Sequence, residues 1–302
     1  MKAWVLHGIN DLQLNDVPLP DPRDGEVLVQ VKAAGICSSD IPRVYTTGAY
    51  HYPIILGHEF SGVTADGRRA GVFPLIPCHT CSACRAGHYE TCSSYSYIGS
   101  RQNGAFSEYV AVPEWNLVPL PNNMTFEQAA LLEPAAVALH AVQKIGIQEI
   151  TKAAVIGNGI IGQLIGEWLS FFNIQHVEVL GRNDQSSFEH YDVCFEVVGS
   201  LGAFERCVKY TRESGRIVLV GNPTFDFNME QKLYWQILRK QLVIHGSWNS
   251  SYPAGWKTVL ANSKHLQLER FISHRYPFEE LSKALHMMYS KKERYSKVLL
   301  TF

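Results

Sequence analysis

The sequence lacks the features that mark a nucleic-acid binder or a secreted protein. Its 302 residues carry a formal net charge of −1 and contain no long run of lysine or arginine, so the basic footprint of a nucleic-acid binder is missing. The first ten residues lack the apolar stretch of a secretory signal, so we expect a cytoplasmic, reducing environment. Repeats and low-complexity tracts are also absent. The remaining composition, 46% hydrophobic and 18% charged, is that of a soluble globular protein long enough for two domains.

One apolar stretch has the length of a membrane span. Residues 153–172 read AAVIGNGIIGQLIGEWLSFF, and twenty apolar residues suffice to cross a bilayer. Three glycines at motif spacing and Glu167 are instead typical of a buried strand, a tight turn and a helix. We therefore favour the strand–turn–helix interpretation and expect no membrane partner.

Four of the seven cysteines lie close together in the sequence. Cys78, Cys81, Cys84 and Cys92 follow the spacing C-x2-C-x2-C-x7-C, which can supply four thiolates to one tetrahedral Zn²⁺. Four unrelated thiols, or two disulfides in a secreted lobe, are the alternatives. A closed four-thiolate site leaves no position for a substrate, so we interpret this cluster as a structural zinc site.

The hydrophobic pattern changes along the chain. Alternating runs at 26–35 and 106–113 indicate a β-rich N-terminal part. Thr125 and Gln128 are spaced as a capping box at the start of a helix. From residue 152 onward, nearly continuous Val/Ile/Leu strands alternate with helical segments, which is typical of a doubly wound parallel sheet.

A glycine motif opens this second part. Gly157, Gly159 and Gly162, with Ile160-Ile161 between the last two, form G-x-G-x-x-G directly after an apolar strand and before a helical pattern. Such glycines permit a tight turn and let the backbone approach a pyrophosphate, which the helix N-terminus favours. A glycine-rich turn that only packs a helix onto a sheet is the alternative.

The next strand ends without the acidic residue that usually binds the ribose of NAD. HVEVL (176–180) is followed by Gly181 and Arg182, where glycine leaves space and arginine pairs well with a 2′-phosphate. We therefore favour NADP over NAD; a merely solvated Arg182 is the alternative. Only the link 181–190 separates this strand from YDVCFEVVG. A third strand with its helix does not fit there, so we predict a trimmed Rossmann sheet.

Three short segments supply metal-competent side chains, namely Cys37, His58 and Glu133. A cysteine, a histidine and a carboxylate with one open position form the ligand set of a catalytic zinc. Each residue also has a simpler explanation: a core thiol, a buried imidazole with its own partners, and a surface acid at a helix end.

Taken together, the motifs resemble those of the zinc-dependent medium-chain dehydrogenases/reductases, and within them the sorbitol dehydrogenase and galactitol-1-phosphate 5-dehydrogenase branch. They occur in the family's order: GICSSD, YPIILGHEFSG, the four-cysteine lobe, IGSRQNGAFSEYV, LLEPAAVALHA, GNGIIG and HGSW. The resemblance implies an α/β protein with a GroES-like β-rich catalytic domain over residues 1–138 and 268–302, and a Rossmann domain over 139–267. It also implies a zinc-dependent oxidoreductase that transfers hydride between NADP or NAD and a sugar alcohol or its phosphate.

The resemblance also assigns roles to single residues. The three metal-competent side chains would hold a catalytic zinc, so that each chain would bind two zinc ions. Glu59 would lie beside this metal as an outer or exchangeable ligand, and Ser39 would relay the proton. Asp40 would hydrogen-bond the far nitrogen of His58 and fix its tautomer.

The sequence departs from many alcohol and sorbitol dehydrogenases in one motif. Ile41-Pro42-Arg43 stands where they carry a histidine of the proton relay, and this is more like the galactitol-1-phosphate type. Arg43, His51 and Arg101 lie in motif loops and are candidates for binding a substrate phosphate, with solvated surface charges as the alternative. We favour a phosphorylated hexitol as the substrate.

Other functions stay open at this point. Reduction of a ketose phosphate, as in the ribulose-5-phosphate reductases, would suit NADP, and a free polyol such as sorbitol is the third choice. A non-enzymatic nucleotide-binding protein would be expected to have lost the zinc ligands, and all three candidates are present here. The family resemblance further implies a homodimer or homotetramer.

Overall fold

The computed structural model describes all residues from Met1 to Phe302, and the chain divides into two compact units. Unit 1 comprises Met1–Glu133 and Tyr252–Phe302, and unit 2 comprises Pro134–Ser251. The sequence analysis placed the two boundaries after residues 138 and 267. In the structure the first boundary falls inside a helix, α4 (Leu132–Gln143), near its first turn.

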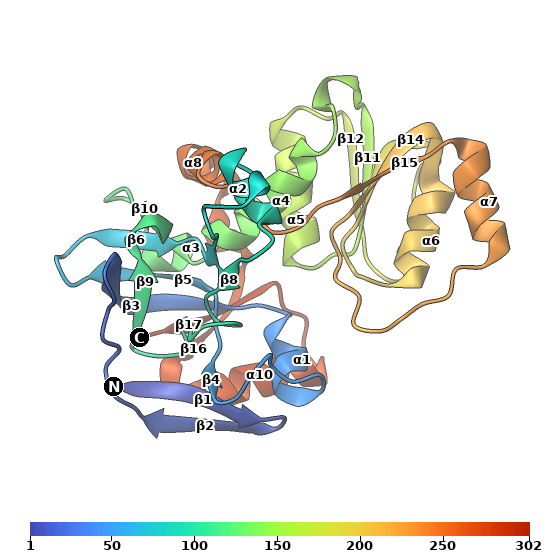
Figure 1. Ribbon diagram of the computed structural model, residues 1–302. Coiled ribbons are helices and arrows are strands. Elements are labelled where there is room, and N and C mark those ends of the chain that lie inside the picture. The colour runs from blue at the N-terminus through green and yellow to red at the C-terminus, as the bar shows by residue number, and fades with distance from the viewer. The chain divides into compact units, whose positions relative to one another are not determined.

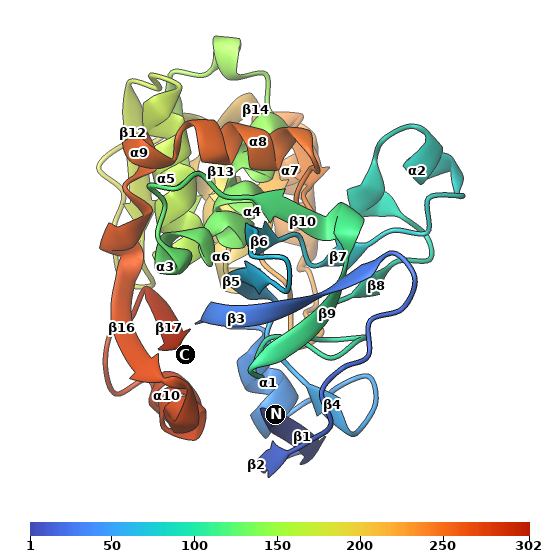
Figure 2. The same cartoon turned by 90° about the vertical axis from the view of Figure 1, so that its left-hand side faces the viewer.

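Unit 1 consists mainly of antiparallel strands. Its seven-stranded sheet has the order β10-β6-β5-β3-β17-β16, with β9 also paired to β3, and its two last strands are parallel. Smaller sheets have the orders β2-β1-β4 and β7-β8. Figure 2 shows β16 and β17 side by side, with α10 (Leu281–Ser290) at their end. The strands are β1 (Lys2–Gly8), β2 (Asp11–Asp16), β3 (Glu26–Ile36), β4 (Ile54–Ile55), β5 (Glu59–Thr64), β6 (Arg69–Val72), β7 (Leu75–Ile76), β8 (Ser96–Tyr97), β9 (Tyr109–Pro113), β10 (Leu117–Pro119), β16 (Ile272–Pro277) and β17 (Lys297–Thr301).

The helices of unit 1 are short. The predicted capping box is confirmed, because Gln128 N donates to Thr125 Oγ1 at 3.1 Å while Gln128 Oε1 accepts from Thr125 N at 3.0 Å. The helix that it starts, α3 (Phe126–Ala129), ends after one turn, and α4 begins separately at Leu132. The other helices are α1 (Asp40–Tyr45), α2 (Ser82–Arg85), α8 (Ala254–Ala261) and α9 (Ser263–Leu266).

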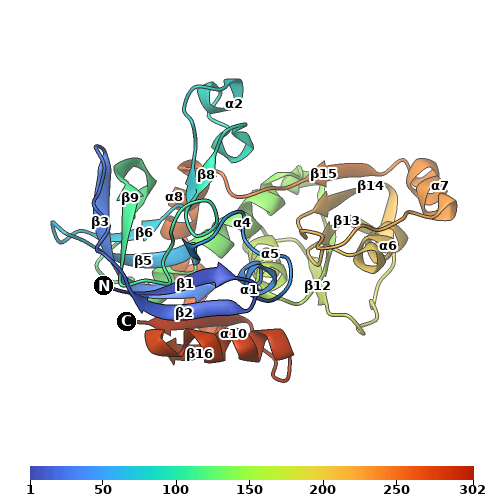
Figure 3. The ribbon, with the colours of Figure 1, turned by 60° about the horizontal axis from the view of Figure 1, so that its bottom comes forward.

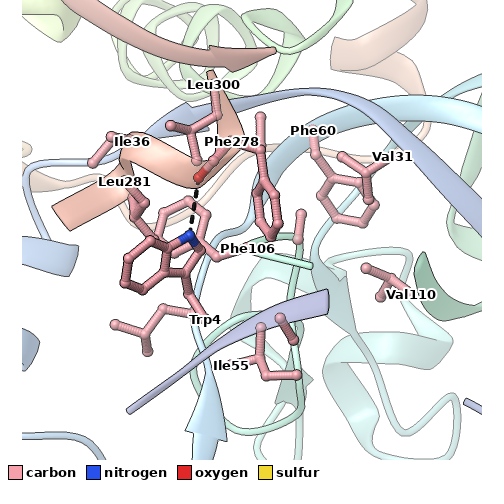
Figure 4. Packing of buried hydrophobic residues seen from close by; sticks show 14 of the residues in the cluster. Trp4, Val31, Ile36, Ile55, Phe60, Phe106, Val110, Phe278, Leu281 and Leu300 are labelled. Carbon is pink, nitrogen blue, oxygen red and sulfur yellow. Dashed lines mark hydrogen bonds between the residues drawn. The ribbon is translucent and has the colours of Figure 1, made fainter. Parts of the chain in front are cut away.

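The core of unit 1 lies between the first strands, the large sheet and α10. Trp4 is its largest side chain near the N-terminus, and its indole Nε1 donates to the carbonyl oxygen of Phe278 at 2.9 Å (Figure 4). Phe106 and Leu281 pack in the same cluster. A buried indole needs a partner for its N–H group, and this bond ties the first strand to the C-terminal part of the unit.

Unit 2 is a parallel five-stranded sheet with the order β12-β11-β13-β14-β15. Helix α5 contacts β11 and β12, α6 contacts β11, β13 and β14, and α7 contacts β14. Figure 1 shows α5 and α6 on opposite faces of the sheet. The predicted trimming is confirmed, because the full doubly wound order has one more strand beyond β12. The elements are β11 (Lys152–Ile156), α5 (Ile160–Phe171), β12 (His176–Leu180), β13 (Tyr191–Glu196), α6 (Leu201–Tyr210), β14 (Thr211–Leu219), α7 (Gln231–Lys240) and β15 (Val243–Gly246).

Side-chain hydrogen bonds fasten the short link that replaces the missing strand. Glu178 on β12 accepts from the Tyr191 hydroxyl at 2.6 Å and from the Ser186 hydroxyl at 2.9 Å. These bonds fix both the middle of the link and its far end to the edge strand. The link therefore passes from β12 to β13 without a helix of its own.

The apolar stretch 153–172 forms β11, the glycine turn and α5, as the strand–turn–helix interpretation predicted. Helix α5 has 12 residues, and no helix of the chain combines the length and the hydropathy needed to span a bilayer.

Candidate functional site

Cys37, His58 and Glu59 place one metal-ligating atom each within 4.8 Å of the others. The sheet of unit 1 brings them together, because β3 ends just before Cys37 and pairs with β5, which begins at Glu59. His58 and Glu59 are buried and Cys37 is half-buried. Two of the three predicted zinc ligands thus meet Glu59, the carboxylate predicted to lie beside them, at one end of paired strands.

The turn after Cys37 is held by polar side chains. Asp40 is fully buried, and its Oδ2 accepts from the Cys37 backbone N–H at 3.0 Å. Its Oδ1 lies 3.7 Å from His58 Nδ1, which is longer than a hydrogen bond, and neither atom has a hydrogen-bond partner. The Ser39 hydroxyl donates to Cys37 Sγ at 3.3 Å. Asp40 and Ser39 therefore contact the ligand residue itself.

Glu133, the predicted third ligand, lies at the start of α4 and outside the 4.8 Å set. It is buried, and its Oε1 accepts from the Tyr97 hydroxyl at 3.3 Å. The Tyr97 ring in turn meets the His58 ring edge-on, with centroids 5.7 Å apart. Tyr97 was missed by the sequence analysis, although it immediately precedes one of the family motifs.

Lys297 is the second residue that the sequence analysis missed. It opens β17 with only 1% of its surface exposed, and its Nζ forms an ion pair with Glu59 Oε2. The same Nζ donates to the Ile36 carbonyl oxygen at 3.4 Å. The sequence feature that could have revealed it is a lysine at the start of the apolar strand KVLLTF, where a buried residue is expected.

The electrostatics of this cluster fit a bound cation. Burial raises the pKa of Cys37 to about 12 and that of Glu133 to about 7, and the neighbouring Glu59 carboxylate adds to both rises. A divalent cation would supply the positive charge that favours the ionised forms of these groups. A thiol, an imidazole and carboxylates are also the donor types that Zn²⁺ accepts, so the residues present fit a catalytic zinc.

The four-cysteine lobe projects from the rest of unit 1 beyond β8 and carries α2 (Figure 3). Cys78, Cys81, Cys84 and Cys92 bring their sulfur atoms within 4.8 Å of one another. None is in a disulfide, and Cys78 Sγ lies 3.9 Å from Cys84 Sγ. Thiolates on a tetrahedral zinc lie about 3.8 Å apart for Zn–S bonds of about 2.3 Å, so the lobe fits a zinc ion.

Hydrogen bonds prepare this lobe for thiolates. The Thr80 hydroxyl donates to Cys78 Sγ at 3.4 Å, and this bond together with backbone N–H groups lowers the pKa of Cys78 to about 5. Backbone N–H groups also lower the pKa of Cys81 to about 7. Burial instead raises the pKa of Cys84 to about 12. Ionised sulfur is the form that binds zinc, so two of the four cysteines are prepared for the metal by hydrogen bonds, and Cys84 would need the charge of the cation to ionise.

The glycine motif in unit 2 leaves room for a ligand at the N-terminus of α5. Gly157 has a φ of +127°, and a Cβ on Gly162 would lie 1.9 Å from the Gly157 carbonyl oxygen. A Cβ on Gly159, the residue before the helix, would meet nothing within 4 Å. Two glycines thus serve the turn itself, and the open space at Gly159 fits the close approach of a pyrophosphate.

The residues after β12 carry both signs of charge. Arg182 is exposed, as expected for a residue that reaches for a ligand or for solvent. Asp184, which the sequence analysis missed, accepts from the Gly181 N–H at 2.7 Å through Oδ2. Arg206 on α6 donates to the Gly181 carbonyl oxygen at 2.8 Å and so fastens this turn. An acid therefore stands near the end of β12 after all, three residues later than the usual position.

The three candidates for a substrate phosphate have different surroundings. Arg43 Nη1 donates to the carbonyl oxygen and the hydroxyl of Ser39. The guanidinium of Arg101 lies over the ring of Tyr95, 4.3 Å from its centroid, and 5.2 Å from that of Tyr50. His51 Nε2 lies 3.3 Å from the Arg101 carbonyl oxygen. The structure therefore brings His51 and Arg101 together in one exposed group and places Arg43 on the turn after Cys37.

Comparison with known proteins identifies the family. Residues 23–122 match the alcohol dehydrogenase GroES-like domain, and residues 175–300 match the zinc-binding dehydrogenase domain. The galactitol 1-phosphate 5-dehydrogenase of Escherichia coli K12 is 31% identical over 305 aligned positions, which cover 86% of this chain and 88% of the relative. The chain belongs to the zinc-dependent medium-chain dehydrogenase/reductase family.

Other members of the medium-chain family extend the likeness over the whole chain. The sorbitol dehydrogenase of Bacillus subtilis is 25% identical and covers 99% of this chain and 97% of its own. The crystal structure of galactitol-1-phosphate dehydrogenase from Escherichia coli superposes with a TM-score of 0.88 at 29% identity, covering all of both chains. This medium-chain dehydrogenase is thus an oxidoreductase of GroES-like and Rossmann parts, as the sequence motifs predicted.

Proposed function

We propose that the protein is a zinc-dependent polyol-phosphate dehydrogenase that oxidises a secondary alcohol of a hexitol phosphate with a nicotinamide dinucleotide. The observation that carries the proposal is the meeting of Cys37 and His58 with buried carboxylates at one end of the large sheet. The likeness of the chain to the Escherichia coli galactitol 1-phosphate 5-dehydrogenase supports a hexitol phosphate as the substrate class.

In this proposal Cys37, His58 and Glu133 hold a catalytic zinc, and the four-cysteine lobe holds a second, structural one. A zinc ion in the first site would supply a Lewis acid for the substrate hydroxyl. The carbinol hydrogen would pass as hydride to a bound nicotinamide, and the hydroxyl hydrogen would leave as a proton. Ser39 is placed to accept or pass on that proton, because its hydroxyl already contacts Cys37 Sγ.

Two residues prepare the ligands in this proposal. Asp40 orients the backbone at Cys37 through its bond to the Cys37 N–H, and its second oxygen faces His58 Nδ1 across 3.7 Å. Glu59 lies beside the ligands and is paired with Lys297. A carboxylate that faces a ligating imidazole favours one tautomer of the ring.

We propose that Arg101 and His51 bind the substrate phosphate. Arg43 instead binds and orients Ser39 in this proposal. A guanidinium has five N–H donors, and one nitrogen of Arg101 bonds the Tyr95 carbonyl oxygen at 2.9 Å. The remaining donors suit a phosphate dianion. The rings of Tyr95, Tyr97 and His58 form a row, with successive centroids 6.4 and 5.7 Å apart, that leads from Arg101 to the metal ligands.

For the cofactor we propose NADP over NAD. The pyrophosphate would lie at Gly157, Gly159 and Gly162, before the first turn of α5 that begins with Ile160-Ile161. Arg182 is exposed beyond Gly181, where an arginine can pair with a 2′-phosphate. Asp184 opposes this preference because its carboxylate would repel the same phosphate.

A preference for NADP would favour the reductive direction, so a ketose-phosphate reductase is the second candidate function.

For assembly we propose a cytoplasmic homodimer or homotetramer. The edge strand β15 exposes Val243 and Ile244, and exposed apolar side chains on an unpaired edge suit contact with a second copy.

The test is the initial rate of reduced-cofactor formation with a hexitol 1-phosphate and with the matching free hexitol at equal concentration. A strong preference for the phosphate supports the proposal. Equal rates, or a preference for the free hexitol, would move the function toward a sorbitol-type dehydrogenase and make the Arg101 group structural. An absence of turnover with every polyol, ketose and cofactor pair would contradict the enzyme itself.

A further inference from the structure

The turn after β12 lacks the elements that follow it in a full doubly wound domain. There a crossover helix and a third strand would come next, and that strand would lie beyond β12 in the sheet. The chain instead runs from Leu180 through the short link 181–190 and returns to the sheet as β13. Residues 181–184, at the start of this link, form the turn beside which the 2′-phosphate of the proposed cofactor would lie. The support of this turn therefore comes from other parts of unit 2.

The glycine motif supports the start of the turn. The Gly157 N–H donates to the Leu180 carbonyl oxygen at 2.8 Å, which ties the end of β12 to the motif. A Cβ on Gly181 would lie 3.9 Å from Asn158 Cβ, so the turn and the motif are neighbours. Within the turn, Asp184 Oδ2 accepts from the Gly181 N–H at 2.7 Å. These contacts place the turn next to the proposed pyrophosphate site.

Arg206 on α6 binds the carbonyl oxygens of the turn. Its Nη1 donates to the Gly181 carbonyl oxygen at 2.8 Å and lies 3.5 Å from that of Arg182, and its Nη2 donates to the Asp184 carbonyl oxygen at 2.8 Å. The guanidinium also lies over the ring of Tyr210, with Cζ 5.9 Å from the centroid. A guanidinium holds its N–H donors in a fixed planar fork, which suits several carbonyl oxygens at once. Arg206 thus joins both ends of the turn to the helix.

Support of this kind affects how well Arg182 can bind a phosphate. Arg182 is exposed on the turn, and a residue on a loosely held loop loses conformational freedom when it binds a ligand. That loss of freedom lowers the affinity, whereas a backbone that is already fixed avoids it. Because Arg206 bonds the carbonyl groups before and after Arg182, it fixes the backbone that carries this side chain before the cofactor arrives.

We propose that Arg206 is a positioning residue for the adenosine end of the cofactor. It holds the turn 181–184 from α6, in place of the missing helix and strand, and so orients Arg182 toward the 2′-phosphate. The inference rests on the proposed function, whose cofactor it concerns, and adds a residue that lies outside both the glycine motif and the turn. Loss of Arg206 should therefore weaken ligands that carry a 2′-phosphate much more than ligands that lack one.

The experiment titrates the full chain with ADP-ribose and with 2′-phospho-ADP-ribose, which differ only in the 2′-phosphate, and measures both dissociation constants by calorimetry. Arg206→Met should bind the 2′-phosphate form about tenfold more weakly than the wild type and ADP-ribose to within about threefold, because only the contact from Arg182 loses its orientation. Arg206→Gln provides a second variant if Arg206→Met does not fold. Arg239→Met, which removes an exposed arginine of α7, is the matched control and should equal the wild type.

A double-variant cycle separates positioning from a direct contact of Arg206 with the phosphate. If Arg206 acts through Arg182, then Arg206→Met should weaken binding by less than about threefold in an Arg182→Gln background. The amide protons of residues 181–184 should also exchange faster with solvent in ligand-free Arg206→Met than in the wild type, because the turn has lost its support. A further tenfold loss in the Arg182→Gln background would overturn the proposal. So would unchanged exchange in the turn.

The outcome for the proposed function is read from the wild type. Wild-type protein that binds neither ADP-ribose nor its 2′-phosphate form would contradict the dinucleotide site and with it the proposed function. Wild-type protein that binds both equally well would contradict the choice of NADP and the role of Arg206 together. Wild-type protein that prefers the 2′-phosphate form, with an Arg206→Met variant that binds it equally well, would contradict the role of Arg206 alone.

Discussion

Arg43 Nη1 donates to the hydroxyl oxygen of Ser39 at 2.9 Å and to its carbonyl oxygen at 2.8 Å. The same Ser39 hydroxyl donates to Cys37 Sγ at 3.3 Å. The arginine thus occupies an acceptor site of the serine and turns its proton toward the ligand cysteine. A guanidinium has only N–H donors and no acceptor, so Arg43 orients Ser39 but takes no proton from it.

This relationship predicts different effects for the two arginines that the sequence offered for phosphate binding. Arg43→Met should lower kcat about tenfold on hexitol phosphate and on free hexitol alike, because the Ser39 hydroxyl loses its orientation; general acid–base groups contribute roughly 10²–10⁴ in rate. Arg101→Met should raise KM for the phosphate ester and leave the free hexitol unchanged. Steady-state kinetics of both variants on both substrates measure this split.

Lys144→Met serves as a matched control, because this residue lies in the turn after α4 and bears the same charge. Its kinetics should equal those of the wild type on both substrates. An Arg43→Met variant that loses activity only on the phosphate ester would instead make Arg43 the phosphate ligand and contradict the assignment to Ser39.

The sequence predicted the parts of this protein that local spacing encodes. Short-range patterns predicted the cysteine lobe and the capping box at Thr125, and the structure has both. They also predicted that the parallel sheet lacks its third strand, and it does. Lys297 could not be predicted in this way, because it lies 238 positions from Glu59 and only the pairing of β17 with β3 brings the two together. Asp184 was missed because a loop, not the strand end, supplies the acid.

The two charged residues after β12 should set the cofactor preference in opposite directions. Arg182→Gln should weaken NADP⁺ binding about tenfold, since one good bond from an arginine to a phosphate is lost, and should leave NAD⁺ binding unchanged. Asp184→Asn should strengthen NADP⁺ binding, because the carboxylate no longer repels the 2′-phosphate. Isothermal titration of the wild type and of each variant with both cofactors gives the four ratios of variant to wild-type dissociation constant.

Gly162→Ala is the control for the cofactor site itself. Its Cβ would lie 1.9 Å from the Gly157 carbonyl oxygen, so the turn must open and both cofactors should bind more weakly. Equal loss of NAD⁺ and NADP⁺ affinity in Arg182→Gln would mean that Arg182 does not bind the 2′-phosphate of NADP⁺.

The four-cysteine lobe predicts the zinc content of the protein. The wild type should contain two zinc ions per chain, and Cys92→Ser should contain one, because the lobe then offers three thiolates. Cys207→Ala is the matched control, since this buried cysteine lies on α6 in the core of unit 2 and should leave the zinc content at two. Elemental analysis after gel filtration measures the content. Two ions in Cys92→Ser would show that the lobe is not a zinc site.

Asp192 predicts a pH-dependent contribution to the stability of unit 2. Its carboxylate accepts from the backbone N–H groups of Thr151 and Lys152 at 2.8 and 2.9 Å and from Arg212 Nε at 2.7 Å. Burial alone would raise the pKa of Asp192, but these hydrogen bonds outweigh it and lower the pKa to about 2. The ionised form is therefore more stable in the folded chain than in the unfolded one.

For such a lowered pKa, the stabilisation is fully present above about pH 4, where unfolded aspartate is ionised, and is lost as the pH falls toward 2. Asp192→Asn should lower the free energy of unfolding by about 1–2 kcal/mol at pH 7, a value reduced for partial solvent screening. The difference from the wild type should shrink toward zero at pH 2–3. Urea unfolding across this range measures it, and Asp226→Asn on an exposed loop should show no difference at any pH. A constant difference from pH 7 to pH 2 would show that the variant loses packing rather than charge.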